Sequence, residues 1–357
     1  MPVQYRSNMS ASERRKRERY LAATVITCIS AAVIFGVIHV VQLGANRMDD
    51  MKARITYDLA DMKDHIRAAG EDITRHRIHE SKKRAQKVYQ WNELEALLTT
   101  EQWQELASMV TIPAGEFLMG TDSERADKFN RPQHTVFLPE YKIDKYPVTH
   151  AEFAQFVVAT QHRPPLDWKD GLIPDGKVQY PVTMVTWYDA VSYCRFREKR
   201  LPTEAEWEKA ARGTDGRRWP WGNQMDANRL NTYYHVGASN IVTTYKTGVS
   251  PYGVYDMAGN VSEWTASDFL PYDGSSAAGD TFQPKKVQAM TAEDRTLKVA
   301  DLVAVEGVYK VRRGGSWKSD PFSTSTYHRN FSMPYYASDF FGFRCVVTVP
   351  DTSQAIN

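Results

Sequence analysis

A series of short motifs rich in glycine, proline and tryptophan runs through the chain from Ile112 onward. The last motif is the most informative and has two parts, residues 313–317 (RGGSW) and 342–345 (GFRC). The preceding motifs are residues 112–120 (IPAGEFLMG), 145–149 (KYPVT), 201–208 (LPTEAEWE) and 259–264 (GNVSEW). Between them the chain consists of short runs punctuated by Gly, Pro, Asn and Asp, which favour turns. This pattern is unlike that of a helix bundle and predicts a domain with little regular secondary structure.

In this order the motifs resemble those of the formylglycine-generating enzyme (sulfatase-modifying factor) family. The resemblance covers residues 110–350. It implies a variant of the C-type lectin fold, an α+β fold in which two helices pack on small sheets.

The same resemblance bears on catalysis. The family enzymes work through a pair of cysteines just after the Gly-Gly-Ser-aromatic motif, and counting along this chain puts Ser319 and Thr324 at those positions. Copper(I) is bound by soft thiolates, and hydroxyl groups are poor ligands for it. We therefore expect a non-catalytic domain that binds a partner, as a scaffold or an accessory subunit of a membrane or envelope complex.

A non-haem iron oxidoreductase is the alternative function, because other enzymes of the broader superfamily hold iron with histidines and carboxylates. Ergothioneine-type members carry a His-x3-His-x-Glu pattern on a helical domain, and residues 48–109 lack this pattern. Further along, the histidines are scattered, with no spacing that puts two of them on one face of an element. They are His134, His150, His162, His235 and His328.

Calcium is the cofactor that the resemblance implies. Asn260 and Glu263, with the carbonyl of Val261, form a turn whose oxygen ligands suit this hard cation, and family members bind calcium there. A second family calcium corresponds to Asn231, but residues 235–240 lack the Asp that completes that site. The alternative is a turn whose polar groups satisfy one another without metal.

Three cysteines are present: Cys28, Cys194 and Cys345. In the family, cysteines at the positions of Cys194 and Cys345 form a structural disulfide. Closing a loop of that length contributes about 4–5 kcal/mol in the chain-entropy model. Two buried free thiols are the alternative.

The N-terminal part contains a long apolar segment. Residues 20–45 include no charged side chain, and roughly 20 apolar residues suffice to cross a bilayer. The basic residues of segment 1–19 predict a cytoplasmic N-terminus. We therefore expect a single-pass protein of the plasma (inner) membrane, in contact with lipid through residues 20–45, with a periplasmic or extracytoplasmic globular domain. A cleaved signal peptide is the alternative, although its apolar region is usually shorter, roughly 7–15 residues.

Residues 46–109 are predicted to form a helical stalk. Its apolar residues alternate at spacings of four and three, which is the pattern of a helix with one apolar face. These residues are Ile55, Leu59, Met62, Ile66, Ala69 and Ile73. The face binds a partner helix or a second copy of the chain, or it packs on the chain's own globular domain. Residues 351–357 form a C-terminal tail.

Within the domain, helices are predicted at residues 150–160 and 187–199, and a third helix is predicted to begin at Thr203 with Glu206 in a capping box. Short strands are expected at residues 135–138 and 343–349. Glu204, Glu206 and Glu208 are interpreted as partners in structural ion pairs with Arg200 and Arg212.

The surface offers three candidate contact regions for a protein partner: the polar insertion 266–311, the aromatic loop 331–341 and the stalk. The aromatic loop is equally compatible with a place in the core. Nucleic acid is not an expected partner, because the formal net charge is only +2 and the folded part has no basic patch.

Overall fold

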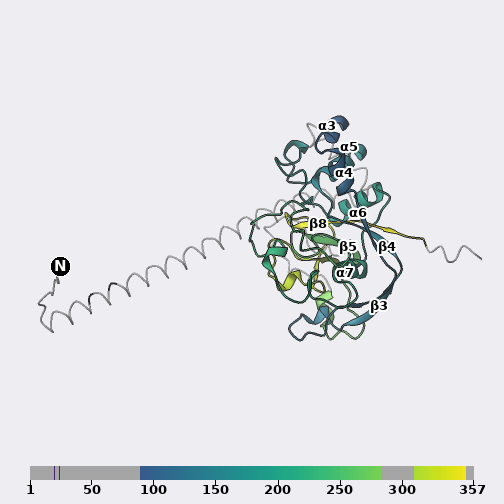
Figure 1. Ribbon diagram of the computed structural model, residues 1–357, viewed down its shortest axis with the longest axis vertical. Coiled ribbons are helices and arrows are strands. Elements are labelled where there is room, and N and C mark those ends of the chain that lie inside the picture. The colour runs from purple at the N-terminus through teal and green to yellow at the C-terminus, as the bar shows by residue number, and fades with distance from the viewer. Residues whose placement is uncertain (1–19, 21–23, 25–88, 283–308, 351–357) are drawn as a thin grey trace, which may run out of the picture. The chain divides into compact units, whose positions relative to one another are not determined.

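Short strands and short helices, joined by long irregular segments, make up the described part of the chain (Figure 1). The computed structural model describes residues 20, 24, 89–282 and 309–350. In this part no helix is long and apolar enough to cross a membrane. Several predicted segments lie outside the described residues. They are the tails 1–19 and 351–357, stalk residues 46–88 and, apart from residues 20 and 24, the span 20–45.

Three small sheets organise the described domain. A three-stranded sheet has the order β1 (Met109–Ile112), β4 (Tyr141–Asp144), β9 (Val346–Thr348), and β2 (Gly115–Met119) pairs with β3 (His134–Leu138). A four-stranded sheet has the order β7 (Arg329–Ser332), β6 (Lys310–Arg313), β5 (Ser262–Asp268), β8 (Phe341–Phe343). All pairs are antiparallel except β5 with β8. The ends of the predicted insertion therefore belong to paired strands, since Asp268 of β5 lies opposite Lys310 of β6.

Five short α-helices are described: α3 (Trp91–Glu95), α4 (Thr100–Leu106), α5 (His150–Thr160), α6 (Trp187–Phe196) and α7 (Glu204–Arg212). Single 3-10 turns occur at Lys128–Asn130, Lys169–Gly171, Ala227–Arg229, Gly279–Phe282 and Phe322–Thr324. The three predicted helices are present. Thr149, Thr186 and Thr203 each cap one of them, in capping boxes with the acidic residue three positions on. Helix α6 ends earlier than predicted, because Glu198 adopts a left-handed conformation with φ 56°.

The strand predicted at residues 135–138 is confirmed as β3, and the strand predicted at 343–349 is present in part, as β9, with Phe343 belonging to the separate strand β8. The chain leaves the four-stranded sheet after β8 and joins the three-stranded sheet as β9. Between the two strands, Arg344 pairs with buried Glu263, and Cys345 is bonded to Cys194 of α6 with a Cα–Cα distance of 5.7 Å. These two tertiary contacts determine where the strand breaks.

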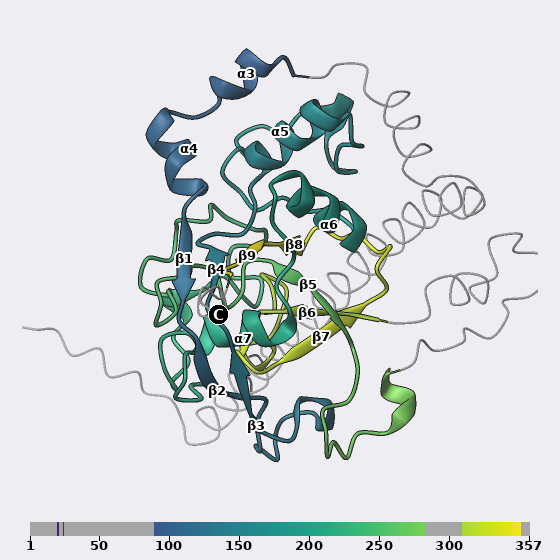
Figure 2. The same cartoon turned by 90° about the vertical axis from the view of Figure 1, so that its right-hand side faces the viewer.

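The largest apolar cluster lies where α5 and α6 pack on β8. The ring of Phe153 stacks on that of Tyr193 with centroids 5.7 Å apart, and both lie edge-to-face against Phe343. Helices α3 and α4 also pack on the domain, because Leu94 joins this cluster and Leu106 packs with Tyr146 (Figure 2). In the aromatic loop, Phe341 is buried in the same cluster and Phe340 packs against it.

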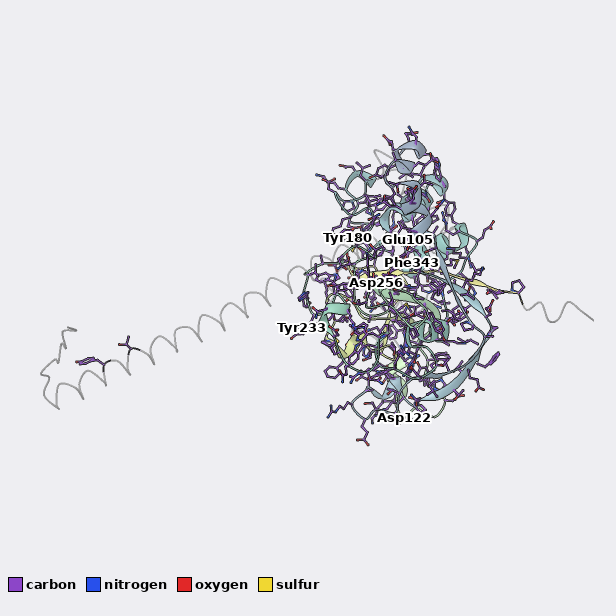
Figure 3. All side chains as sticks on the ribbon, viewed as in Figure 1. Glu105, Asp122, Tyr180, Tyr233, Asp256 and Phe343 are labelled. Carbon is purple, nitrogen blue, oxygen red and sulfur yellow. A yellow bond between two sulfur atoms is a disulfide. The ribbon has the colours of Figure 1, made fainter. Side chains whose placement is uncertain are left out.

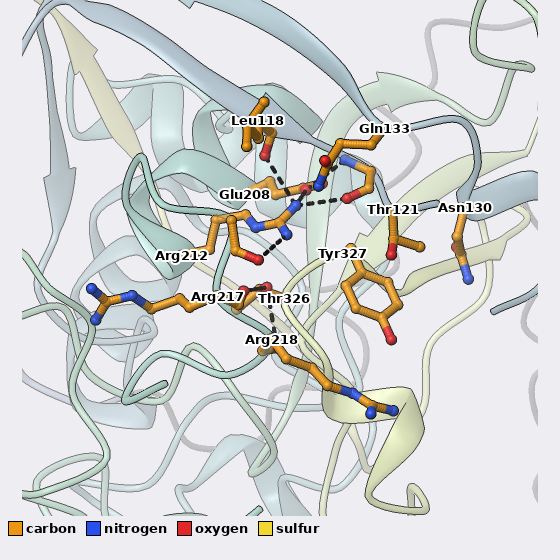
Figure 4. A network of polar contacts seen from close by, with 12 residues as sticks. Leu118, Thr121, Asn130, Gln133, Glu208, Arg212, Arg217, Arg218, Thr326 and Tyr327 are labelled. Carbon is orange, nitrogen blue, oxygen red and sulfur yellow. Dashed lines mark hydrogen bonds and ion pairs between the residues drawn. The ribbon is translucent and has the colours of Figure 1, made fainter. Parts of the chain in front are cut away.

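A second, polar core lies around α7 and confirms the structural interpretation of its glutamates. Glu206 pairs with Arg200 at 2.6 Å, and Glu208 pairs with Arg212 at 2.6 Å (Figure 4). Glu204 accepts hydrogen bonds from Arg313 at 3.1 Å and from Arg329 at 2.7 Å. These contacts hold β6 and β7 against α7, and they fix the start of the loop that follows β6.

Candidate functional site

The loop after β6 brings Ser319 and Thr324 together around a glycine. Gly315 has a φ of +66°, and a Cβ atom there would meet Thr324 Cγ2 at 3.0 Å and Ser319 Cβ at 3.2 Å. It would also lie 2.7 Å from the carbonyl oxygen of Ser323. Only glycine therefore lets the loop close in this way, and the closure places the two hydroxyl residues on either side of one backbone position.

Both hydroxyl groups are engaged by the chain itself. Ser319 Oγ accepts a hydrogen bond from the backbone N–H of Ser316 at 2.9 Å. Thr324 Oγ1 accepts from Trp219 Nε1 at 3.2 Å and donates to the carbonyl of Pro321 at 2.7 Å. A catalytic hydroxyl needs a base within hydrogen-bond reach. Among the described residues, the hydrogen bonds of these two hydroxyls include no histidine and no carboxylate.

His328 lies close by in sequence but is held in a neutral form. Burial, and secondarily the charge of Arg313, lower the pKa of His328 to about 4. Its backbone N–H donates to the carbonyl of Ser325 at 2.9 Å. The hydrogen bonds of the Ser319 and Thr324 hydroxyls do not include His328, so it is not placed as a base toward either of them in the described structure.

Two consecutive tyrosines border the loop in a conformation that tyrosine rarely adopts. Tyr233 and Tyr234 have φ values of 51° and 57°. Their backbone N–H groups donate to Ser319 O at 2.8 Å and to Trp317 O at 2.7 Å. These bonds hold the strained backbone, and Tyr233 is left 69% exposed at the margin of the domain (Figure 3). Strain of this kind concentrates at functional sites.

Two further apolar side chains are exposed, one just after these tyrosines in the sequence and one on the loop that contains Ser319. Val236 follows them, and Phe322 is 60% exposed on the loop that contains Ser319. The guanidinium carbon of Arg218 lies 5.0 Å from the ring centroid of Phe322 and 4.7 Å from that of Trp219. We call Tyr233, Tyr234, Val236 and Phe322 the aromatic rim. The sequence analysis did not identify the rim, because nothing in the sequence marks two adjacent tyrosines as left-handed.

The predicted calcium ligand Glu263 is already fully engaged. Its Oε2 accepts from Arg344 Nε at 2.7 Å and from Trp207 Nε1 at 2.8 Å, and its Oε1 accepts from Arg344 Nη2 at 2.7 Å. Glu263 and Arg344 are both fully buried. A cation at this carboxylate would have to displace a buried arginine, so Glu263 does not fit the calcium site that the motif suggested.

The side chain of Asn260, next to buried Val261, is likewise engaged by other groups of the chain. Its Oδ1 accepts from the backbone N–H of Asn240 at 3.0 Å, and its Nδ2 donates to Asp256 Oδ2 at 2.9 Å. Burial raises the pKa of Asp256 to about 7. Asn260 and Glu263 therefore face different partners and do not form one set of ligands.

Asn231 differs from these residues in one respect. Its Nδ2 donates to Ala238 O at 2.8 Å, but its buried Oδ1 has no hydrogen-bond partner in the described structure. A free buried oxygen fits a cation ligand better than the engaged carboxylate of Glu263 does. The described residues contain no group of three or more His, Cys, Asp or Glu placed to hold a metal ion, so any further ligands at Asn231 would be amide or carbonyl oxygens.

The histidines considered for iron lie in separate surroundings. His150 accepts from Trp168 Nε1 at 2.9 Å, and His162 Nε2 lies 2.8 Å from Asp189 Oδ1. His134 Nδ1 lies 3.0 Å from Pro132 O. The described residues therefore do not supply the ligand set that the iron alternative requires.

Comparison with known proteins places this geometry in context. Residues 95–349 match the family model described as sulfatase-modifying factor enzyme 1-like domain. The chain is 33% identical over 260 residues to the serine/threonine-protein kinase Pkn1 of Chlamydia trachomatis, covering 68% of this chain but only 39% of that protein. It is 30% identical to the inactive C-alpha-formylglycine-generating enzyme 2 of Bos taurus, covering 70% of this chain and 92% of that protein.

Among solved structures, the chain is similar to PvdO from Pseudomonas aeruginosa. The TM-score is 0.51 and the sequence identity is 25%, over 67% of this chain and 93% of that one. The similarity in fold therefore extends over the described domain.

Proposed function

Because the chain belongs to the family of sulfatase-modifying factor enzyme 1-like domains, we propose that it is a non-catalytic member that binds a partner. Ser319 and Thr324 stand where the family enzymes carry their cysteine pair. The observation that carries the proposal is that both hydroxyls are held by Ser316, Trp219 and Pro321, with no base in contact. The likeness to a relative described as inactive supports it.

The aromatic rim is the surface that we assign to binding. Exposed aromatic side chains held on a fixed backbone supply contact area at little entropic cost, which is why they are enriched at the centres of interfaces. Here the hydrogen bonds from the backbone of Tyr233 and Tyr234 to the Ser319 loop provide the fixed backbone. Phe322, 60% exposed, adds a ring from the loop that contains Ser319.

Membrane attachment forms the second part of the proposal. The charge-free residues 20–45 anchor the protein, and the basic segment before them keeps the N-terminus in the cytoplasm. The domain then works outside the cytoplasm as a scaffold or accessory subunit. A protein partner fits this role better than nucleic acid, given the nearly balanced charge.

An activity assay tests the non-catalytic part of the proposal. We expect the full-length protein to form no aldehyde above background on a Cys-x-Pro-x-Arg peptide, even after loading with copper, because Ser319 and Thr324 provide no thiolate. An active family enzyme is the positive control. Turnover at the rate of that enzyme would mean that the chemistry uses residues other than these two.

Site-directed photo-crosslinking in cells tests the binding part. A photoreactive phenylalanine analogue at Tyr233 or Phe322 is expected to give the same discrete crosslinked product. The matched control is Phe137, which is 64% exposed on β3, outside the rim. Equal crosslinking from all three positions, or none from the two rim positions, would contradict a specific interface at the rim.

A further inference from the structure

A cleft of about 650 Å³ is lined by residues of α3, α4 and α5, by the loops that follow α3 and α4, and by Arg197, which follows α6. Its volume is typical of small-ligand sites. The family match begins at residue 95, so Trp91 in its wall precedes the matched region. Neither the hydroxyl pair nor the aromatic rim belongs to the cleft, and the proposed function therefore does not account for it.

One wall combines two indoles with a carboxylate. Trp91 Nε1 donates to Glu95 Oε1 at 2.8 Å, and Trp103 Nε1 donates to the backbone carbonyl of Glu95 at 3.2 Å. Both indoles are thus fixed to the same residue. All three side chains line the cleft, and Trp91 is 46% exposed. Indole faces beside a carboxylate attract cations, because the ring quadrupole and the negative charge act in the same direction.

The opposite wall adds a second carboxylate, which is buried. Glu152 of α5 is only 8% exposed, and its Oε2 accepts from the backbone N–H of Thr149 at 2.9 Å and from its hydroxyl at 2.8 Å. Among the described residues no lysine or arginine forms a salt bridge with Glu152, and the charge of Arg197 acts on it only weakly compared with burial. A buried carboxylate without a cationic partner is costly, and a bound cation would reduce that cost.

Among the described residues that line the cleft, only one is a cation. Arg197 follows α6, and its Nη1 donates to Gln155 Oε1 at 3.3 Å. The lining thus carries two carboxylates and one guanidinium, so its net charge is negative when Glu152 is ionised. Together with the two indoles, this balance favours an organic cation over an anion or a neutral apolar ligand.

From this arrangement we propose that the cleft binds an alkylammonium group, with the cation against the indoles of Trp91 and Trp103 and near the carboxylates of Glu95 and Glu152. An alkylated ammonium suits the site better than a small metal ion. Its methyl or methylene groups pack on the rings while its charge meets the acids.

Titration of the full-length protein with tetramethylammonium chloride tests the proposal. Burial raises the pKa of Glu152 to about 7, so the titration is done at pH 8, with sodium chloride at equal ionic strength as the reference. Saturation-transfer NMR on the methyl protons reads out binding. We expect saturable binding to the wild type and a Kd raised about tenfold by Glu95→Gln, since one charge–charge contact is lost and the charge-assisted hydrogen bond that orients Trp91 is weakened.

Two further variants make the result decisive. Glu101→Gln removes an exposed carboxylate of α4 that does not line the cleft, and its Kd is expected to equal that of the wild type. Trp103→Leu is expected to weaken binding as Glu95→Gln does. Because Glu95 is exposed, its variant should fold, and circular dichroism checks this. Absence of saturable binding to the wild type, or an unchanged Kd in Glu95→Gln, overturns the proposal.

Discussion

At the scale of single residues, several buried charges in this domain form ion pairs with buried partners far away in the sequence. Glu263 is an example, because Arg344 donates hydrogen bonds to both of its carboxylate oxygens and neither side chain is exposed. In the sequence, the GNVSEW motif suggested a metal ligand, since a carboxylate on an irregular turn is compatible with either role. Only the packing of Arg344, which lies 81 positions away, distinguishes the two roles.

Replacement of Glu263 is therefore predicted to act through Arg344. Glu263→Gln should destabilise the domain by about 3–5 kcal/mol, because it leaves a buried guanidinium without its counter-charge. Urea denaturation measures the change. Asp215→Asn is the matched control, since Asp215 forms an exposed pair with Arg217, and it should cost about 1 kcal/mol or less.

The same variant separates this role from calcium binding. Any change in unfolding midpoint that a chelator causes in the wild type should persist in Glu263→Gln, because the carboxylate is not a ligand. Asn231→Ala should reduce such a response if the free Oδ1 of Asn231 holds the ion. A chelator response that disappears in Glu263→Gln would show that Glu263 binds the metal after all.

At the scale of elements, the three main helices were predictable because their start signals are local. A threonine and the acidic residue three positions later define each start, and these pairs form the same hydrogen bonds wherever the helix packs. The break between β8 and β9 was not predictable. It depends on contacts of Arg344 and Cys345 with residues far away in sequence.

The candidate sites show the same limit. Counting along the final motif located Ser319 and Thr324, because they lie in one continuous loop. The aromatic rim depends on a left-handed backbone at Tyr233 and Tyr234. Non-glycine residues seldom adopt this conformation, and no local sequence pattern predicts it here. The cleft depends on how α3 and α4 pack against α5, and such packing cannot be read from periodicity.

The disulfide is the element-scale contact that most directly tests this topology. Cys194 of α6 and Cys345 before β9 are 151 positions apart, and both are fully buried. We predict that peptides containing the two cysteines remain linked in a non-reduced digest of native protein, measured by mass spectrometry. A Cys194→Ala/Cys345→Ala variant should lose about 4–5 kcal/mol of stability. Alkylation of both cysteines without prior reduction would contradict the pairing.

At the scale of the whole molecule, the proposed position of the domain relative to the membrane rests on charge rather than on fold. Residues 13–19 (ERRKRER) precede the only long apolar run of the sequence, and basic residues are retained on the cytoplasmic side. A disulfide joining Cys194 to Cys345 also favours an oxidising compartment for the domain. Both arguments support the proposal that the domain lies outside the cytoplasm.

We therefore predict that protease added to intact spheroplasts digests the domain, and that alkaline carbonate does not extract the full-length chain. A cytoplasmic protein that resists protease until lysis is the control for intact spheroplasts. Removing the charge tests the physical cause. Replacing Arg14, Arg15, Lys16, Arg17 and Arg19 with glutamine should weaken the retention of the N-terminus in the cytoplasm, and it should therefore increase the fraction of protein whose domain is protected from protease. A soluble form beginning near Asn46 would instead show that residues 20–45 are a cleaved signal, and the binding function would then belong to a secreted domain.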